Sequence, residues 1–283
     1  MNIILIIISI TSMVAQNSVF NNVCKKNLHT REHIFKFNIF VYAVCMCIFG
    51  VLLIGNGISV YTVITALIFG IVTALSNFYK MRSLALGPMH ITLLITTASM
   101  IIPTMSGVFF GETFSMTKLL AVLVLIFFIY LSLGQSNDKK VNKSWIICCI
   151  LAFVFQGTIG VLQKIHQSSV YKGEINAFLC IAFACSLVYS IFWGRRSGET
   201  VKLGKMNFFL ALFCGVCAFC MNYINMKLSG ILPSQLFFPL VNGSAIVLSS
   251  LVSIFFFKEI PTQKQVVGLC GGILSLILIC IVK

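Results

Sequence analysis

Residues 77–88 read NFYKMRSLALGP and residues 222–233 read NYINMKLSGILP, so two distant stretches of the chain share one pattern. Asn, Met, a basic residue and Pro coincide in them at a constant spacing of 145 residues. After the next apolar run, FFGE at 109–112 corresponds to FFKE at 256–259. A glutamine with a lysine eight or nine residues after it also recurs: Gln16 and Lys25 in the first half, and Gln156 and Lys164 in the second. This agreement in order, spacing and helix phase predicts an internal repeat.

The composition around this repeat is that of an integral membrane protein. Of 283 residues, 59% are hydrophobic and only 9% are charged, and the mean hydropathy is +1.04. A soluble domain carries about 25% charged residues. So few charges cannot cover a water-facing surface of this size, which excludes a soluble globular protein.

Apolar runs between charged or turn-rich segments predict about ten membrane-spanning helices. They lie at 2–23, 37–55, 58–79, 88–110, 117–134, 145–163, 174–193, 207–226, 232–257 and 264–282. We therefore expect an all-α integral membrane fold, with one five-helix repeat in 1–136 and a second in 143–283. Because each repeat has an odd number of spans, the second copy is inverted relative to the first. Inverted repeats are typical of transporters.

The net charge of +14 has a membrane explanation. Fifteen of the 20 lysines and arginines lie in the connections after odd-numbered spans. By the positive-inside rule these connections face the cytoplasm, and both termini face outward. No basic face with interleaved aromatic residues suggests DNA or RNA, so we expect no nucleic-acid partner.

Enzyme chemistry is not expected from this sequence. A membrane-embedded enzyme needs clustered His, Asp or Glu for acid–base or metal chemistry. Only His29 and His33 have helical spacing, and no matching acidic motif accompanies them. Cys214, Cys217 and Cys220 lie along one helical stripe. We favour close helix packing over a soft-metal site for them, because His ligands and paired CxxC motifs are missing. We therefore expect no catalytic residue, metal or cofactor.

The repeated pattern resembles the drug/metabolite transporter superfamily, and most closely its EamA-type members. A Pro opens the fourth and ninth spans (Pro88 and Pro233), and each span ends in Phe-Phe-x-Glu before a further helix. The resemblance covers essentially the whole chain and is strongest in Asn77–Leu133 and Asn222–Ile281. It implies a ten-helix carrier whose central cavity is formed by spans one, three, four, six, eight and nine. It also implies cytoplasmic termini, the reverse of the orientation that the charge distribution predicts.

Polar side chains within spans are candidates for a substrate cavity. In lipid such groups are costly unless they face protein or water. The candidates are Gln16, Asn17, Asn77, Thr92, Thr96, Thr97, Gln156, Asn222, Asn225, Gln235 and Asn242. For any single residue, a hydrogen bond between helices is an equally good explanation. For the set as a whole, we favour a polar cavity.

Four basic residues and two prolines are further candidates on the same helices. Lys80, Arg82, Lys164 and Lys227 lie near span ends. They are suited to attract an anionic group, although snorkelling to the membrane interface explains them as well. Pro103 and Pro239 lie inside spans, where a kink serves either gating or simple bending.

Several other residues are predicted to be structural. Glu112 and Glu259 lie at helix boundaries, and Thr262-x-x-Gln265 is typical of a capping box at the start of the tenth span. Gly268, Gly271 and Gly272 indicate close packing of that span, against the fifth span or against a second protomer in a homodimer.

The acidic residues narrow the function further. All six lie in connections or at span ends, whereas proton-driven export of cationic drugs needs a membrane-embedded carboxylate. The leading interpretation is a transporter that moves a small polar metabolite, amino-acid-like or related, across the cell membrane by alternating access, as an exporter. Multidrug efflux and a non-transport role in membrane assembly remain alternatives. The expected partners are the small-molecule substrate and the lipid bilayer.

Overall fold

The computed structural model describes residues 2–26, 30–53, 57–87, 89–112, 115–132, 143–196, 203–257 and 262–281. Within these ranges every regular element is a helix. The helices are α1 (Asn2–Lys26), α2 (Arg31–Leu52), α3 (Val60–Leu86), α4 (Met89–Ala98), α5 (Ile101–Ser106), the 3-10 helix η1 (Gly107–Phe110), α6 (Met116–Ser132), α7 (Lys143–Gln167), α8 (Ile175–Arg196), α9 (Lys205–Ile231), α10 (Ser234–Phe257) and α11 (Gln263–Ile281).

These helices form a multi-pass membrane protein. Eight of the described helical segments are long and apolar enough to cross a membrane, and the fourth of them runs through α4, α5 and η1 as one segment, Thr92–Phe110. The apolar stretches Met116–Leu131 and Ser234–Leu248, within α6 and α10, are shorter. Large apolar side chains such as Ile3, Val60 and Met206 are exposed on the outside of the bundle, as lipid contact requires.

Several helix ends differ from the predicted spans, and two differ by six or seven residues. α2 begins at Arg31, six residues before the predicted start, because Thr30 caps its first turn by accepting a hydrogen bond from the His33 backbone N–H. α3 continues to Leu86, beyond the predicted end at 79. Lysine and arginine are good helix formers, so Lys80 and Arg82 do not end the helix. Pro88 and Glu259 lie outside the described residues.

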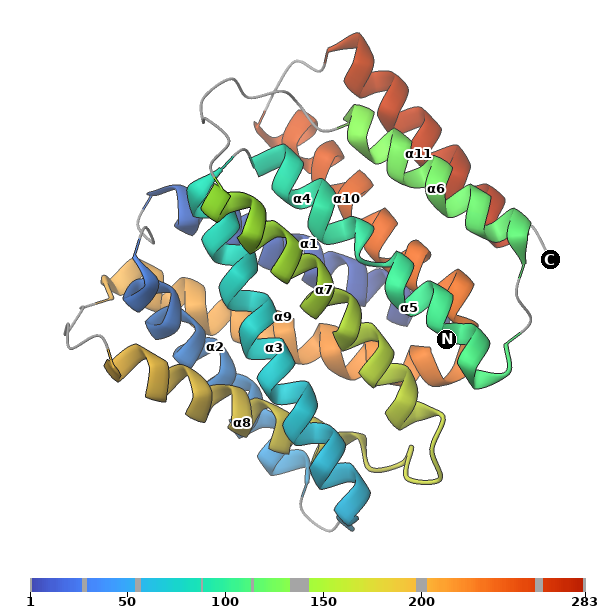
Figure 1. Ribbon diagram of the computed structural model, residues 1–283. Helices are drawn as coiled ribbons and strands as arrows, with labels where there is room; N and C mark the ends of the chain where they lie inside the picture. The colour runs from blue at the N-terminus through green and yellow to red at the C-terminus, as the bar shows by residue number, and fades with distance from the viewer. Residues whose placement is uncertain are drawn as a thin grey trace.

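The packing relates the two halves by an approximate two-fold axis. α3 packs against α7 and α8, and α9 packs against α1 and α2 in the corresponding way. Likewise α1 contacts α10, and α7 contacts α4 and α5. α6 and α11 lie side by side at one edge of the bundle (Figure 1). Exchanging the halves converts one set of contacts into the other, which is the arrangement of inverted repeats.

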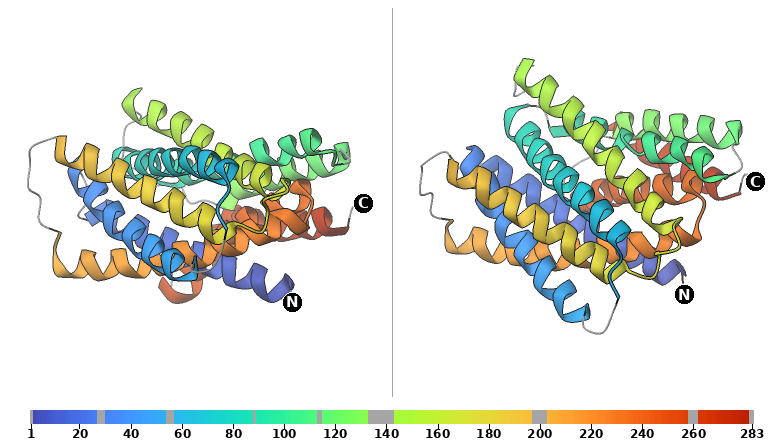
Figure 2. Two further views of the ribbon diagram at one scale, coloured as in Figure 1. Left: turned by 90° about the horizontal axis from the view of Figure 1, so that it is seen from below. Right: turned by 60° about the horizontal axis from the view of Figure 1, so that its bottom comes forward.

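Two apolar clusters form the interior. The first joins α2, α3, α8 and α9 through side chains such as Phe37, Phe69 and Phe178. The second joins α1, α6, α10 and α11 through side chains such as Val122 and Phe237. α7 and the broken fourth span cross between the helices of these clusters (Figures 1 and 2).

Candidate substrate cavity

A polar cavity of about 80 Å³ lies where the two halves meet. A single water occupies roughly 10–15 Å³ of such space, so the cavity has room for several waters or a small solute. It is lined from α1, α3, the broken fourth span, α7, α9 and α10. These are spans one, three, four, six, eight and nine, the six that the family resemblance implied.

Helical periodicity explains how each helix contributes to the lining. Gln156, Gly160 and Gln163 lie on one face of α7, because residues four and seven apart share a face. Met13, Gln16, Asn17 and Phe20 line the cavity from α1 with the same spacing. Gly160 is needed on α7 because a side chain there would meet Pro103 at 2.8 Å and Phe238 at 2.9 Å.

Seven of the eleven polar candidates line this cavity. They are Gln16, Asn17, Asn77, Gln156, Asn222, Asn225 and Asn242. Thr96 does not; its hydroxyl donates to the Thr92 carbonyl of its own helix at 3.0 Å. Gln235 does not either; its Oε1 accepts a hydrogen bond from the Ser115 backbone N–H at 3.1 Å, next to the start of α6. Gln235 thus makes the contact between helices that was the alternative, whereas the Thr96 hydroxyl bonds within its own helix.

The two further threonines also lie outside the lining. The hydroxyl of Thr92 accepts a hydrogen bond from Nε1 of Trp145 at 2.9 Å and so joins α4 to α7. Thr97 is partly buried but is not among the lining residues.

The side-chain amides of Asn77 and Gln156 are held by neighbouring helices. Nδ2 of Asn77 donates to the Tyr42 hydroxyl at 2.9 Å, which ties α3 to α2. Oε1 of Gln156 accepts from the Ser76 hydroxyl at 2.9 Å. These bonds fix the orientation of both amides at the edge of the cavity.

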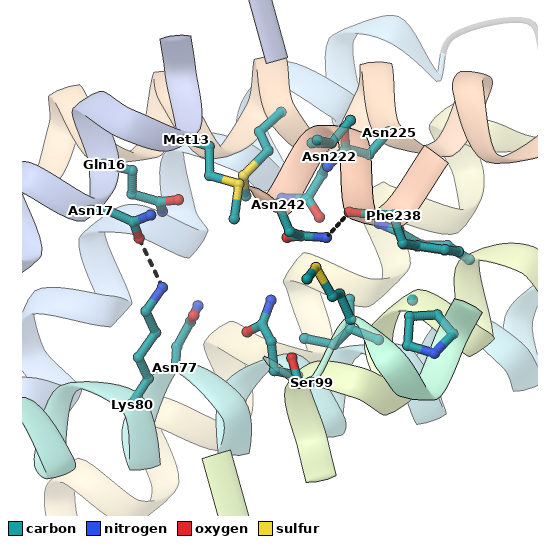
Figure 3. A pocket seen from close by; sticks show the side chains of 18 of the residues that line it. Met13, Gln16, Asn17, Asn77, Lys80, Ser99, Asn222, Asn225, Phe238 and Asn242 are labelled. Atoms are coloured by element: carbon teal, nitrogen blue, oxygen red, sulfur yellow. Dashed lines mark hydrogen bonds between the residues drawn. The ribbon is translucent and has the colours of Figure 1, made fainter. Parts of the chain in front are cut away.

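Asn222 and Asn242 are oriented differently, by their own helices. Nδ2 of Asn222 donates to the Ala218 carbonyl at 2.8 Å, and Nδ2 of Asn242 donates to the Phe238 carbonyl at 2.9 Å. Because a carbonyl only accepts, the amide nitrogen must be the bonded atom in each case. The amide oxygens are therefore directed away from their helices and face the cavity (Figure 3).

Lys80 is the one charged residue among those that line the cavity. Its Nζ donates to Oδ1 of Asn17 at 2.8 Å, across from α3 to α1 (Figure 3). The other three basic candidates lie elsewhere. Arg82 does not reach the lining, and Lys227 is exposed, with Nζ 4.4 Å from the centre of the Tyr223 ring.

Comparison with known proteins identifies this arrangement. Residues 143–281, which contain α7 to α11, match the model of the EamA-like transporter family. The chain is an EamA-like transporter. It belongs to the drug/metabolite transporter superfamily and is a multi-pass protein of the membrane.

The match to solved structures extends over the rest of the transporter. One crystal structure aligns with 99% of this chain and with 99% of its own, with a TM-score of 0.74 and 14% sequence identity. At that identity the likeness shows the fold alone. No curated protein sequence matches this transporter.

Lys164 pairs with an acidic residue away from the cavity. Its Nζ lies 2.5 Å from Oε1 of Glu112, and both side chains are largely buried. The same Nζ donates to the Ser229 carbonyl at 3.0 Å and to the Leu232 carbonyl at 3.4 Å, at the end of α9. Lys164 thus satisfies carbonyls that the end of a helix leaves without partners.

Glu112 joins the first half of the transporter to the second. Its Oε2 accepts the Ser234 backbone N–H at 2.7 Å, and its Oε1 accepts the Ser234 hydroxyl at 3.2 Å, at the start of α10. Gly111 makes the turn that places Glu112 there, because its φ of 75° is in the left-handed region. The prediction that Glu112 is structural fits this placement.

A second glutamate makes the converse contact from the other half. Oε2 of Glu174 accepts the Ser59 backbone N–H at 3.0 Å and the Ser59 hydroxyl at 2.8 Å, at the start of α3. Hydrogen bonds from the Thr62 side chain, and then from Ser59, lower the pKa of the Glu174 carboxyl. Each half therefore caps a helix of the other half with a carboxylate.

The two prolines differ in their surroundings. The fourth span is broken between Ala98 and Ile101, and Pro103 follows at the cavity wall. Pro239 is buried within the continuous helix α10 and does not line the cavity. A helix broken beside the site is a common feature of transporter binding sites.

The start and the glycines of α11 make, in part, the contacts that the sequence predicts for them. Gln265 Oε1 accepts the Thr262 backbone N–H at 2.8 Å, and Gln265 N–H donates to the Thr262 hydroxyl at 3.4 Å, which confirms the capping box. A side chain at Gly271 would overlap Phe128 of α6, and one at Gly272 would meet Val247 of α10. These two glycines therefore serve contacts within one chain.

Two polar lining residues, Ser99 and Gln163, were missed by the sequence interpretation. Gln163 had a signal, since it lies seven residues after Gln156 and so on the same helical face. Ser99 had none, because a serine in a helix commonly bonds its own backbone, as Ser99 does to the Thr96 carbonyl at 2.5 Å.

Proposed function

We propose that this transporter exports a small polar metabolite, amino-acid-like or related, by alternating access. The observation that supports this most strongly is the composition of the cavity. Eight amide side chains line it, five from asparagine and three from glutamine. Amides buried at membrane depth are costly unless they bind water or a polar solute.

The same lining argues against multidrug efflux. Apolar cationic drugs favour aromatic surfaces and an acidic group, and proton-coupled antiport needs a carboxylate that alternates between proton and drug. Among the residues that line the cavity there is no aspartate or glutamate, and the charged residue present is a lysine.

Two features support alternating access. The halves pack as inverted repeats, so exchanging their conformations converts one open state into the other. The contacts of Glu112 with Lys164 and Ser234 join the halves at the end of the bundle where α9 ends and α10 begins. Such contacts must separate for the cavity to open at that end. The outward direction rests on the family resemblance.

The first test compares metabolites inside and outside cells that produce the wild type or the Gln16→Leu, Asn222→Leu double variant at equal abundance. These changes keep side-chain size roughly constant and remove two amides from the lining. Thr158→Val is the matched control, because the Thr158 hydroxyl is on an exposed face and donates to the Val154 carbonyl of its own helix at 2.8 Å.

We expect the wild type and Thr158→Val to lower the internal level of at least one polar metabolite and raise it outside, and the double variant to resemble empty cells. The proposal fails if the double variant redistributes the same metabolite as strongly as the wild type. It also fails if the wild type resembles empty cells across a broad panel of supplied polar metabolites.

A further inference from the structure

We infer that an anionic phospholipid binds this transporter where α2 begins and α8 ends, with its phosphate group between Arg31 and Arg196. The site is separate from the central cavity, and the inference does not depend on what the transporter carries.

An open pocket of about 200 Å³ lies at this place. Since one water takes up about 10–15 Å³ of such space, the pocket has room for a phosphodiester group. The packing of α2 along α8 forms it from two distant parts of the sequence (Figure 1). The lining residues are Arg31, Glu32 and Phe35 near the start of α2, and Trp193 and Arg196 near the end of α8.

Aromatic rings hold both arginines in place. Cζ of Arg31 lies 5.6 Å from the centre of the Phe78 ring, which is stacked on the ring of Phe35 with centres 4.6 Å apart. Cζ of Arg196 lies 5.1 Å from the centre of the Trp193 ring. A guanidinium group that rests on a ring still presents its N–H donors in its own plane. The two side chains are therefore oriented without using these donors.

The donors of both arginines are available to a ligand. Among the described residues, neither guanidinium group has a hydrogen-bond or ion-pair partner. Two guanidinium groups around one pocket form the donor set that recognises a phosphate, because each can donate two parallel N–H bonds to its oxygens.

The charge of the pocket matches a single phosphodiester. Two arginines and one glutamate line it, which gives two positive charges and one negative charge, a net charge of +1. The phosphodiester of a phospholipid carries one negative charge. A phospholipid whose headgroup adds no positive charge therefore neutralises the pocket, whereas a zwitterionic phospholipid does not.

The position of the pocket favours a lipid over a soluble anion. Arg31 is the first residue of one membrane span and Arg196 is the last of another, so both lie at the level of the lipid headgroups. Val188 and Phe192 are exposed, and they lie on the same face of α8 as Arg196 because the three residues are four apart. This apolar stripe leads from the pocket toward the membrane interior and provides a surface for the acyl chains.

The distribution of basic residues indicates the leaflet. The connections that meet at the pocket follow the first and seventh spans, and connections of this kind hold most of the lysines and arginines. By the positive-inside rule they face the cytoplasm. Anionic lipids of the cytoplasmic leaflet bind in basic pockets between membrane helices.

The test measures lipid binding to the purified full-length transporter in detergent by native mass spectrometry. Phosphatidylglycerol and phosphatidylcholine with identical acyl chains are compared, and the apparent Kd of the first bound lipid is determined for each. The melting temperature of every variant shows that it is folded.

We expect the wild type to bind phosphatidylglycerol about tenfold more tightly than phosphatidylcholine. The Arg31→Gln, Arg196→Gln variant should bind phosphatidylglycerol about tenfold or more weakly and lose the preference, since it lacks the charged hydrogen bonds. The Arg31→Lys, Arg196→Lys variant should be intermediate, because lysine keeps the charge without the fork. Arg195→Gln is the matched control and should behave as the wild type, because Arg195 is exposed beside the pocket but does not line it.

Four results would overturn the inference. The wild type could bind both lipids equally, or the double glutamine variant could keep the preference for phosphatidylglycerol. Arg195→Gln could weaken binding as much as the double variant, which would show a general attraction to basic surface. Finally, glycerol phosphate could displace the lipid at equal concentration, which would make the site one for soluble anions. If the double glutamine variant does not fold, the double lysine variant decides, and an affinity equal to that of the wild type overturns the inference.

Discussion

Asparagine has two roles in this cavity, and the partner of its Nδ2 atom decides between them. Asn77 donates across to Tyr42 of a neighbouring helix and holds α2 and α3 together. Asn222, at the equivalent position of the second half, donates to its own helix and exposes its oxygen. Both residues could be placed in the cavity from the sequence, because the repeat and the family resemblance indicated it. Their orientations could not, since these depend on which donors and acceptors the folded chain brings nearby.

A single glycine sets the distance between α3 and α8. A side chain at Gly70 would lie 2.3 Å from the Ala182 carbonyl oxygen, and Ser186 Oγ donates to the Gly70 carbonyl at 2.7 Å. We expect Gly70→Ala to destabilise the fold by about 1–3 kcal/mol, because the obstructing atom is backbone and cannot move alone. The melting temperature in detergent measures this.

Gly173→Ala is the matched control for this substitution. No atom lies within 4 Å of the side chain it would add, so its melting temperature should stay close to that of the wild type. A Gly70→Ala variant as stable as Gly173→Ala would contradict the close packing of α3 on α8.

At the scale of helices, the two halves are joined by carboxylates at helix ends. Glu112 of the first half caps α10, and Glu174 of the second half caps α3. The sequence indicated that Glu112 is structural, but it did not indicate the partner Lys164. That lysine follows an apolar run and ends a span, so interfacial snorkelling explained it equally well. The contact forms only when α7, α9 and α10 are packed together.

The Glu112–Lys164 pair can be tested by a double-mutant cycle. Glu112→Gln or Lys164→Met alone leaves a largely buried partner without its counter-charge, and each should destabilise the protein by about 1–3 kcal/mol. The double variant should lose less than the sum of the single losses, with a coupling of about 0.5–3 kcal/mol. Thermal unfolding in detergent measures all three variants.

Lys227→Met is the control for removal of a lysine, because Lys227 is exposed and contacts a tyrosine ring rather than a carboxylate. If the two single losses in stability add strictly, Glu112 and Lys164 do not interact. Their contact would then not join the two halves at that end of the bundle.

Helix ends also show how far the sequence predicts the fold. Each of the ten predicted apolar runs corresponds to a helical segment of the described chain, because lipid requires continuous apolar helices. The end of α3 was placed seven residues early because Lys80 and Arg82 were taken as the membrane boundary. In a bundle with a polar interior, a charge on the inner face of a helix does not mark that boundary. The break in the fourth span was indicated by Pro103 but not its exact place at residues 99–100.

At the scale of the whole molecule, two inverted halves enclose one cavity that is nearly symmetric in its amides and asymmetric in its charge. We propose that the repeats are 1–136 and 143–283. The division between them, at 137–142, lies outside the described part of the chain. The symmetry supports a carrier that exposes one site to each side in turn.

The measurement that tests this account most directly is counterflow in liposomes containing the purified protein. Liposomes are loaded with unlabelled amino acids, and uptake of a labelled amino acid is followed against its concentration. A carrier that alternates between two states predicts saturable uptake that is accelerated by substrate inside, and loss of both properties in the Gln16→Leu, Asn222→Leu variant. Uptake that rises linearly with concentration and ignores the internal substrate would contradict alternating access through this cavity.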